Sequence, residues 1–349
     1  MKRWAIMGML IVLGGNLNAA LFSKVGTVGA QFLKIGIDPK GIGMGEAYTA
    51  LAKDPLAIYW NPGGLALIKQ QEVSFSDVEW FGGIRNNFIG YILPGALMGT
   101  LGMSISAFTS SQEDVTTPEE PRGTGDNWSY TAITCGISYA RMMTDKFAFG
   151  INFKYLQERI WDIASQGMAT DMGVYFYPGY WGSLRFGFVI KNFGPDMCFA
   201  GGHLFDEWNE DGTPSGISPT EIAKRATPYR LPLCLKLGTA YDIIDTPTNK
   251  LTLAVDVSSP NDGVEKLHIG IEECIMNMFS LRGGYTFDSD ITEPDSVGTT
   301  KLEDREEGMG RFGCGIGITP GIQRLSVDYA VQDMRKLGLA HRIALNIKM

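Results

Sequence analysis

The feature that most constrains this chain is a two-residue alternation. Residues 147–155, FAFGINFKY, place Phe147, Phe149 and Phe153 on one face and small or polar residues such as Gly150 and Lys154 on the other. A period of two is typical of a β-strand with one apolar face. That face can pack in the core of a soluble β-protein, or it can contact the acyl chains of a lipid bilayer.

The same alternation recurs along the chain. It predicts fourteen strands, near residues 71–80, 84–93, 98–109, 128–141, 146–158, 167–178, 183–193, 231–242, 249–258, 265–274, 278–287, 308–319, 322–332 and 339–349. Most of these segments have ten residues or more. Globular strands average about 5–6 residues, whereas a tilted membrane-spanning strand needs about 9–11.

The connections between these segments alternate in length. Short turns are followed by long polar loops at 110–127, 194–230 and 288–307. Short turns at one end and long loops at the other are typical of outer-membrane barrels. The sequence therefore predicts an all-β fold, a fourteen-stranded antiparallel transmembrane β-barrel over residues 71–349 with external loops. A soluble β-protein is the alternative.

The first twenty residues indicate export. Lys2 and Arg3 precede an apolar run that ends in small residues, which is the layout of a signal peptide over residues 1–20. The expected location is the cell outer membrane, with lipid as a partner. Without the leader, 28 basic side chains face 38 acidic ones, which argues against nucleic acid as a partner. Five scattered cysteines leave room for one disulfide at most.

The face opposite the bulky residues carries glycine, alanine and charged side chains, which suits a crowded barrel interior. Basic residues outnumber acidic ones there. The residues expected to face the lumen are Lys154, Asp171, Arg185, Lys191, Lys236, Asp256, His268, Glu272, Arg282, Arg311, Arg324, Asp328 and Arg342.

Residues 21–70 do not alternate, and they predict a short helical plug, or hatch, inside the barrel. Helices are expected at 29–35 and 44–53, with a turn after Asn61. A fourteen-stranded lumen is wide enough to hold such a segment. One hypothesis pairs Glu46 and Asp54 of the plug with arginines of the wall. The alternative is that these carboxylates face water in the lumen.

Residues 41–68, GIGMGEAYTALAKDPLAIYWNPGGLALI, resemble the amino-terminal signature of the PorV/PorQ proteins, within the wider group of FadL-like outer-membrane barrels. The resemblance implies fourteen strands and an amino-terminal hatch with an Asn-Pro-Ala motif. Asn61-Pro62-Gly63 stands at that place, with Gly where Ala is usual. The plug motif comprises Gly41, Gly43, Gly45, Glu46, Asp54, Asn61, Pro62 and Gly63.

Two further patterns partly match a nucleotide-binding loop and a catalytic pair, but each lacks a required residue. Gly41, Gly43 and Gly45 imitate a nucleotide-binding loop, but the sixth position is Glu46, so no cofactor is expected. His268 and Glu272 share the inner face, but no nucleophile stands beside them. The histidines and cysteines show no metal-ligand spacing. The sequence therefore predicts a protein that is not an enzyme and holds no metal.

The longest loop contains a candidate helix start. Ser218 is placed to cap the helix, Pro219 would be its first residue, and Glu221 would complete a capping box, with Ile222 in the flanking apolar contact. Such a helix would act as a lid over the external mouth, dock a partner, or simply decorate the surface.

Two functions follow from these observations. The resemblance to PorV/PorQ favours a secretion-associated shuttle or receptor, whose partners would be exported cargo proteins or a secretion complex. The alternative is a FadL-like passive transporter of long-chain fatty acids or other hydrophobic small molecules. An outer-membrane enzyme ranks last.

Overall fold

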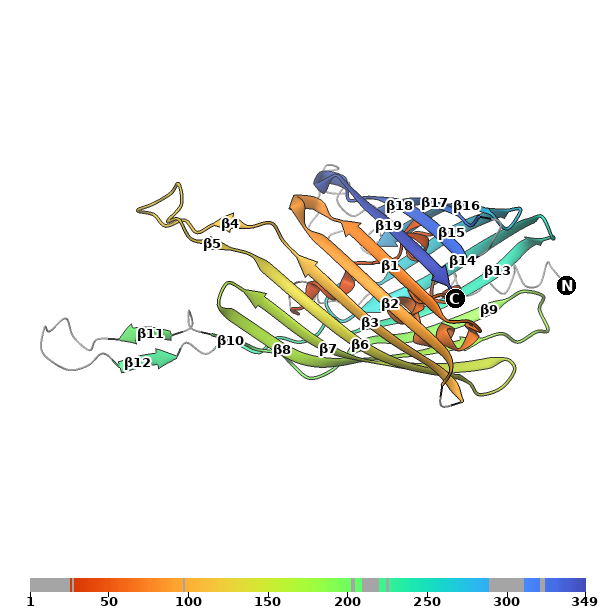
Figure 1. The fold of residues 1–349 in the computed structure, drawn as a ribbon, viewed down its shortest axis with the longest axis horizontal. Coiled ribbons are helices and arrows are strands. Elements are labelled where there is room, and N and C mark those ends of the chain that lie inside the picture. Colours follow the sequence, from red (N-terminus) through yellow and green to blue (C-terminus); the bar gives the residue numbers. More distant parts are fainter. Residues whose placement is uncertain are drawn as a thin grey trace, which may run out of the picture.

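The computed structural model describes residues 26, 28–96, 98–201, 205–208, 220–223, 226–288, 311–320 and 324–349. Long β-strands there surround an amino-terminal segment, residues 28–70, that we call the plug (Figure 1). The expected leader, residues 1–20, lies outside the described residues. None of the helices in the described ranges has the length and apolar character needed to cross a membrane.

The described part of the chain builds a barrel wall of fourteen strands. They are β1 (Glu72–Glu79), β2 (Arg85–Ala96), β3 (Gly99–Thr109), β6 (Tyr130–Met142), β7 (Phe147–Ile160), β8 (Ile163–Phe176), β9 (Arg185–Phe193), β13 (Cys234–Asp245), β14 (Asn249–Pro260), β15 (Lys266–Ile275), β16 (Phe279–Asp288), β17 (Arg311–Ile318), β18 (Leu325–Asp333) and β19 (Leu339–Lys348). Neighbours pair antiparallel, and β1 pairs with β19, so the sheet closes. The predicted fourteen-stranded antiparallel barrel is confirmed.

The two faces of the wall differ as the alternation predicts. In β7 the side chains of Phe149 and Phe153 are 39% and 58% exposed on the outside, whereas Asn152 and Lys154 are 2% and 8% exposed. Closure pairs the backbone edges that hydrocarbon could not satisfy. The bulky apolar face is therefore the outer one, as an outer-membrane barrel requires.

The long loops leave from one end of the barrel, which we call the loop end; the short turns lie at the turn end. Two small hairpins project beyond the loop end in Figure 1. One pairs β4 (Glu113–Asp114) with β5 (Asn127–Trp128), and the other pairs β11 (Phe205–Trp208) with β12 (Thr220–Ala223). A short strand, β10 (Phe199–Gly201), extends the edge of β8.

The predicted helix in the longest loop is wrong over the part that the structure describes. Glu221 and Ile222 belong to strand β12, opposite Glu207 and Asp206 of β11. Thr220 and Ile222 are β-branched and favour extended backbone, and β11 supplies hydrogen-bond partners within the same loop. Ser218 lies outside the described residues.

The plug consists of short helices joined by turns. They are η1 (Gln31–Lys34), α2 (Pro39–Gly43), α3 (Ala57–Trp60) and η2 (Pro62–Leu67). The expected helix at 44–53 is wrong. Helix α2 begins earlier because the Asp38 side chain accepts a hydrogen bond from the Lys40 backbone N–H at 2.9 Å, with Pro39 in the first turn. Gly45 and Glu46 have φ values of 61° and 69° and end the helical backbone.

Glycines of the wall allow the plug backbone to approach closely. A Cβ atom on Gly284 would lie 2.0 Å from the carbonyl carbon of Met44, and one on Gly313 would lie 2.1 Å from the carbonyl oxygen of Ile42. Both distances are far below contact. The wall glycines with such a contact to the plug, which we call the seat glycines, are Gly150, Gly173, Gly187, Gly270, Gly284 and Gly313.

The glycine-rich strand β17 is regular. Strand β17 pairs with both β16 and β18 without a register shift, and its Gly313 and Gly315 face the plug. A break in the strand pairing lies between β8 and β9. The last β8–β9 pair is Thr170 with Phe193, and the next pair along the same edge of β8 is Ser165 with Phe199 of β10. Residues 166–169 of β8, between these two pairs, have no strand partner on this edge. We call this place the seam.

Candidate functional site

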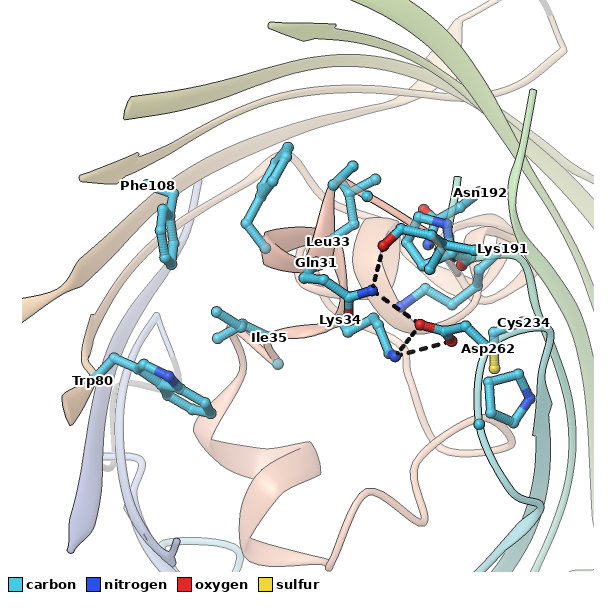
Figure 2. A pocket seen from close by; sticks show the side chains of 18 of the residues that line it. Gln31, Leu33, Lys34, Ile35, Trp80, Phe108, Lys191, Asn192, Cys234 and Asp262 are labelled. Atoms are coloured by element: carbon cyan, nitrogen blue, oxygen red, sulfur yellow. Dashed lines mark hydrogen bonds and ion pairs between the residues drawn. The ribbon is translucent and has the colours of Figure 1, made fainter. Parts of the chain in front are cut away.

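A cavity of about 990 Å³ lies between the plug and the loop end of the barrel. Its floor is the plug segment 28–36 with Glu46 and Tyr59, and its walls are the loop ends of the strands. Figure 2 shows this cavity with Gln31, Leu33 and Lys34 of the plug in its centre. We call it the upper cavity.

The upper cavity has an apolar side and a basic side. Phe108 and Trp80 stand on one side in Figure 2, and Lys191, Asn192 and Asp262 stand on the other. The apolar side continues onto the plug, where the Phe32 ring lies 6.2 Å from the Phe108 ring, centroid to centroid. Lys236, Lys266 and Arg311 also line the cavity, and the guanidinium of Arg342 lies over the Trp80 ring, 5.1 Å from its centroid. The arrangement fits an elongated apolar molecule with a negative end.

Lys191 and Arg342 are deeply buried basic residues of this cavity, and Arg342 is bound to the Gly36 carbonyl. The Lys191 side chain comes from β9 and is 6% exposed. The ammonium nitrogen lies 3.4 Å from the ring centroid of Tyr59 and 5.8 Å from that of Trp60. Within the described ranges, no ion pair includes Lys191. Aromatic faces stabilise a cation only in part, so an anion entering the cavity would gain a strong partner here.

The neighbouring Lys236 already has a partner. Its ammonium nitrogen lies 3.6 Å from the Glu46 carboxylate of the plug and 4.9 Å from the centroid of the Trp60 ring. Burial alone would raise the pKa of Glu46, but Lys236 and other nearby cations lower it to about 2. Glu46 is therefore ionised throughout the physiological range and ties the plug to β13.

A second ion pair joins the plug to the rim. Lys34 of η1 lies 2.9 Å from Asp262, in the loop between β14 and β15, and Gln31 donates a hydrogen bond to the same carboxylate at 2.9 Å (Figure 2). Burial would raise the pKa of Asp262, but the hydrogen bonds from Gln31 and Lys34 outweigh it and lower the pKa.

Wall side chains hold the plug mainly through its backbone. Asp256 accepts hydrogen bonds from the N–H groups of Tyr48 and Thr49, at 3.0 and 2.9 Å. The Arg342 guanidinium donates to the Gly36 carbonyl at 2.7 Å. At Gly45 the carbonyl accepts from Thr286 at 2.8 Å and lies 3.0 Å from His268 Nδ1.

These contacts also answer what His268 does. Its Nδ1 donates to the Gly45 carbonyl, and its Nε2 accepts from Ser258 at 2.8 Å. Glu272 is instead bound to Arg282 at 2.7 Å. Both ring nitrogens thus serve the plug and the wall, and the two residues weighed as a catalytic pair do not meet. No group of three potential metal ligands occurs among the residues that the structure describes.

The plug carboxylates do not pair with wall arginines as hypothesised. Asp54 lies 2.7 Å from Lys40 of the plug itself, and Lys40 reaches Asp328 of β18 at 3.4 Å. The arginines have other partners, because Arg282 binds both Glu272 and Asp328 at 2.7 Å. Arg342 is engaged by the backbone of Gly36, and no arginine of the described ranges forms an ion pair with Glu46 or Asp54.

The motif Asn61-Pro62-Gly63 anchors the turn-end side of the plug. The Asn61 amide donates to the carbonyls of Thr49 and Val174, at 2.8 and 2.9 Å, and its oxygen accepts from the Gly63 N–H at 3.0 Å. A Cβ atom on Gly63 would approach the carbonyl oxygen of Gly173 to 2.9 Å. The motif therefore positions the plug against β8.

The first glycines of the plug motif serve packing as well. A Cβ atom on Gly41 would lie 2.3 Å from the Trp60 ring, and one on Gly43 would lie 3.1 Å from Cβ of Arg282. Gly45 adds the left-handed turn. These three glycines thus fit the plug between Trp60 and the wall, and they form no phosphate-binding loop.

A polar cluster lies directly beneath the seam. Lys154 pairs with Asp171 at 2.7 Å and also donates to the side chain of Asn192. Asp171 accepts from the Asn192 backbone N–H at 2.7 Å. Asn192 has a φ of 60°, which bends the end of β9 away from β8. Asp171 thus satisfies the Asn192 N–H, which has no strand partner where the β8–β9 register shifts.

The other expected lumen residues lie nearer the ends. Arg185 binds Asp242 at the turn end, with nitrogen–oxygen distances of 2.9 and 2.6 Å. Arg324 is exposed there, and Arg311 lines the upper cavity. All five cysteines are free thiols.

Sequence reasoning missed Asp38, Tyr59 and Asp262. Asp38 is fully buried and accepts a hydrogen bond from the Trp60 indole at 3.1 Å. Its Asp-Pro dipeptide is a helix-start signal that could have identified it. Asp262 and Tyr59 carry no such local signal, since their roles depend on contacts across the barrel.

Comparison with known proteins identifies the fold. No protein-family model matches the chain, and no curated protein matches it either. Among solved structures, the toluene transporter TodX of Pseudomonas putida is similar, with a TM-score of 0.52 and 10% identity over 89% of this chain and 96% of that one.

Two other solved structures agree. The monoaromatic hydrocarbon channel CymD has a TM-score of 0.53 and 9% identity, over 90% of this chain and 98% of its own. A FadL homologue of Pseudomonas aeruginosa has a TM-score of 0.52 and 12% identity, over 89% and 98%. At such low identity the likeness concerns architecture: this chain has the barrel fold of FadL-like outer-membrane proteins.

Proposed function

We propose that this protein is a passive outer-membrane transporter that takes up hydrophobic solutes with an acidic head group, such as long-chain fatty acids, from the loop end. The observation that carries the proposal is the upper cavity, with Phe108, Trp80 and the plug on its apolar side and the unpartnered Lys191 on its basic side. Burial against the apolar side would stabilise a bound acyl chain, and a charge-assisted hydrogen bond with Lys191 would stabilise a bound carboxylate.

The similar solved structures support transport as the function class. TodX is a toluene transporter, and CymD is a monoaromatic hydrocarbon channel. A neutral aromatic solute would use the apolar side of the upper cavity but not Lys191. The buried cation is therefore the reason to place acidic amphiphiles first for this chain.

The secretion shuttle implied by the PorV/PorQ resemblance is the competing proposal. The residues that carry that resemblance, 41–63, lie inside the barrel, where they contact the wall and Trp60. They are not placed to meet a folded cargo protein. A shuttle would instead have to use the two hairpins that project beyond the loop end (Figure 1).

The test is uptake of a radiolabelled long-chain fatty acid by cells with the gene deleted and restored. Uptake that fails on deletion and returns with the intact gene supports transport. Unchanged uptake, together with co-purification of exported proteins that share a carboxy-terminal domain, would replace transport by the shuttle.

A further inference from the structure

A second cavity, of about 340 Å³, lies on the opposite side of the plug from the upper cavity. It opens at the turn end, between plug residues such as Leu51 and Lys53 and strand-end residues such as Arg185, Lys250 and Arg324. We call it the turn-end pocket. None of the functions discussed above uses it.

The turn-end pocket has more positive charge than its carboxylates neutralise. Asp242 of β13 is shared by two cations, Arg185 at 2.6 Å and Lys250 at 3.0 Å. The Arg185 Nε is buried and has no hydrogen-bond acceptor. Lys53 faces the same space, and over the described ranges neither Lys53 nor Arg324 takes part in an ion pair. Asp242 is thus shared by Arg185 and Lys250, and Lys53 and Arg324 add two further cations to the lining.

The acidic residues on the opposite wall of the pocket do not neutralise this excess of positive charge. There Asp54 is bound to Lys40 and Glu272 to Arg282, and Glu72 lies opposite Lys348 in the pairing of β1 with β19. Like charges held close together in a partly enclosed space attract an anion.

We propose that the turn-end pocket binds the carboxylate head of a solute that has passed the plug, with Lys53, Lys250 and Arg185 as its partners. This inference deepens the proposed function, and its physiological role rests on it. The carboxylate would supply the negative charge that the pocket lacks, and Leu51 with the neighbouring plug surface would contact the first methylene groups.

The experiment is a titration of the full-length protein in detergent with sodium butyrate, a carboxylate too short to partition strongly into micelles. Lysines are tagged by reductive methylation with carbon-13, and the Lys53 resonance is assigned by its loss in Lys53→Gln. We expect a saturable shift of the Lys53 resonance. Lys69, an exposed plug lysine that does not line the pocket, is the matched control and should not shift.

Sodium sulfate at equal ionic strength separates the carboxylate from anions in general. A Lys53 response to sulfate equal to that with butyrate, or a Lys69 response of the same size, would overturn the proposal. A second variant, Lys250→Gln, should weaken butyrate binding at least tenfold by the Lys53 signal, and unchanged binding would also overturn it. The uptake assay tests the proposed transport function, whereas this titration tests carboxylate binding in the turn-end pocket. Either result can therefore be negative while the other is positive.

Discussion

The carboxylate of Asp256, on the inner face of β14, accepts a hydrogen bond from the backbone N–H of Thr49 at 2.9 Å. The same oxygen accepts from the N–H of Tyr48 at 3.0 Å. One wall side chain thus satisfies two consecutive amide groups of the plug, more than 200 residues earlier in the sequence.

Replacing Asp256 should therefore loosen the plug without opening the barrel. Asp256→Ala leaves two buried N–H groups without acceptors, at a cost of about 1–3 kcal/mol each. We expect hydrogen exchange of the peptide 44–52 to accelerate at least tenfold, as measured by mass spectrometry. Asp256→Asn retains an acceptor oxygen and should stay close to the wild type. Equal protection in all three proteins would contradict a role for this contact.

The seat glycines predict a steric effect. Gly284→Ala places a methyl group 2.0 Å from the carbonyl carbon of Met44, so the plug must move. We expect larger or more frequent current steps in planar bilayers. The neighbouring Gly283 has its nearest atom at 4.0 Å, so Gly283→Ala is the matched control. Identical conductance of the two variants would show that the plug does not depend on this seat.

Because Lys191 is a basic residue of the upper cavity, we expect its replacement to affect the binding of acidic ligands and not that of neutral ones. Lys191→Met keeps the length of the side chain and removes the charge, and a charged hydrogen bond contributes about 1.5–3 kcal/mol. Binding of a long-chain carboxylate should weaken about tenfold to a hundredfold, while toluene binding stays unchanged.

Lys266→Met is the control for that experiment, because Lys266 lines the same cavity but already lies 3.5 Å from Asp288. Calorimetry in detergent measures both ligands. If Lys191→Met and Lys266→Met weaken binding of the long-chain carboxylate to the same extent, Lys191 is not the specific partner of its head group.

The plug should be held less tightly as the pH rises. Burial, reinforced by the Asp54 carboxylate, raises the pKa of Asp38 to about 7. The seated plug therefore binds a proton that a displaced, hydrated plug releases near pH 4. This contribution to seating is complete below pH 4 and is lost as the pH rises through 7. Glu46, with its lowered pKa, titrates below this window.

We accordingly expect more frequent opening events at pH 8 than at pH 5 in planar bilayers. Asp38→Asn keeps the shape and removes the titration, so its opening frequency should change little between the two pH values. A wild-type protein that opens more often at pH 5 would reverse the sign and refute the role of Asp38.

The barrel could be predicted from the sequence because its signal is local. Lipid outside and a packed plug inside impose opposite demands on successive residues, so Phe153 and Lys154 already reveal the two faces. The plug was predicted less well. Its helix α2 depends on the cap at Asp38, and its end depends on the left-handed backbone at Gly45 and Glu46, which override the apolar pattern of 44–53.

The candidate site could be predicted from the sequence only in part. The alternation places Lys191 and Lys236 inside, but it cannot say that Glu46 reaches Lys236 while Lys191 meets the ring of Tyr59. Those contacts join β9, β13 and the plug across the lumen. The β12 strand was missed for a related reason, because its partner β11 lies in the same loop beyond the range of a capping motif.

Besides the ion pairs of Glu46, Lys34 and Lys40, the wall binds the plug through its backbone, which every amino acid shares. Asp256, His268, Thr286 and Arg342 bind carbonyl and amide groups, and the seat glycines touch the main chain. Evolution can therefore exchange many plug side chains, and so reshape the floor of the upper cavity, without disturbing how the plug docks. The same freedom does not extend to the glycines opposite, where even a methyl group is too large.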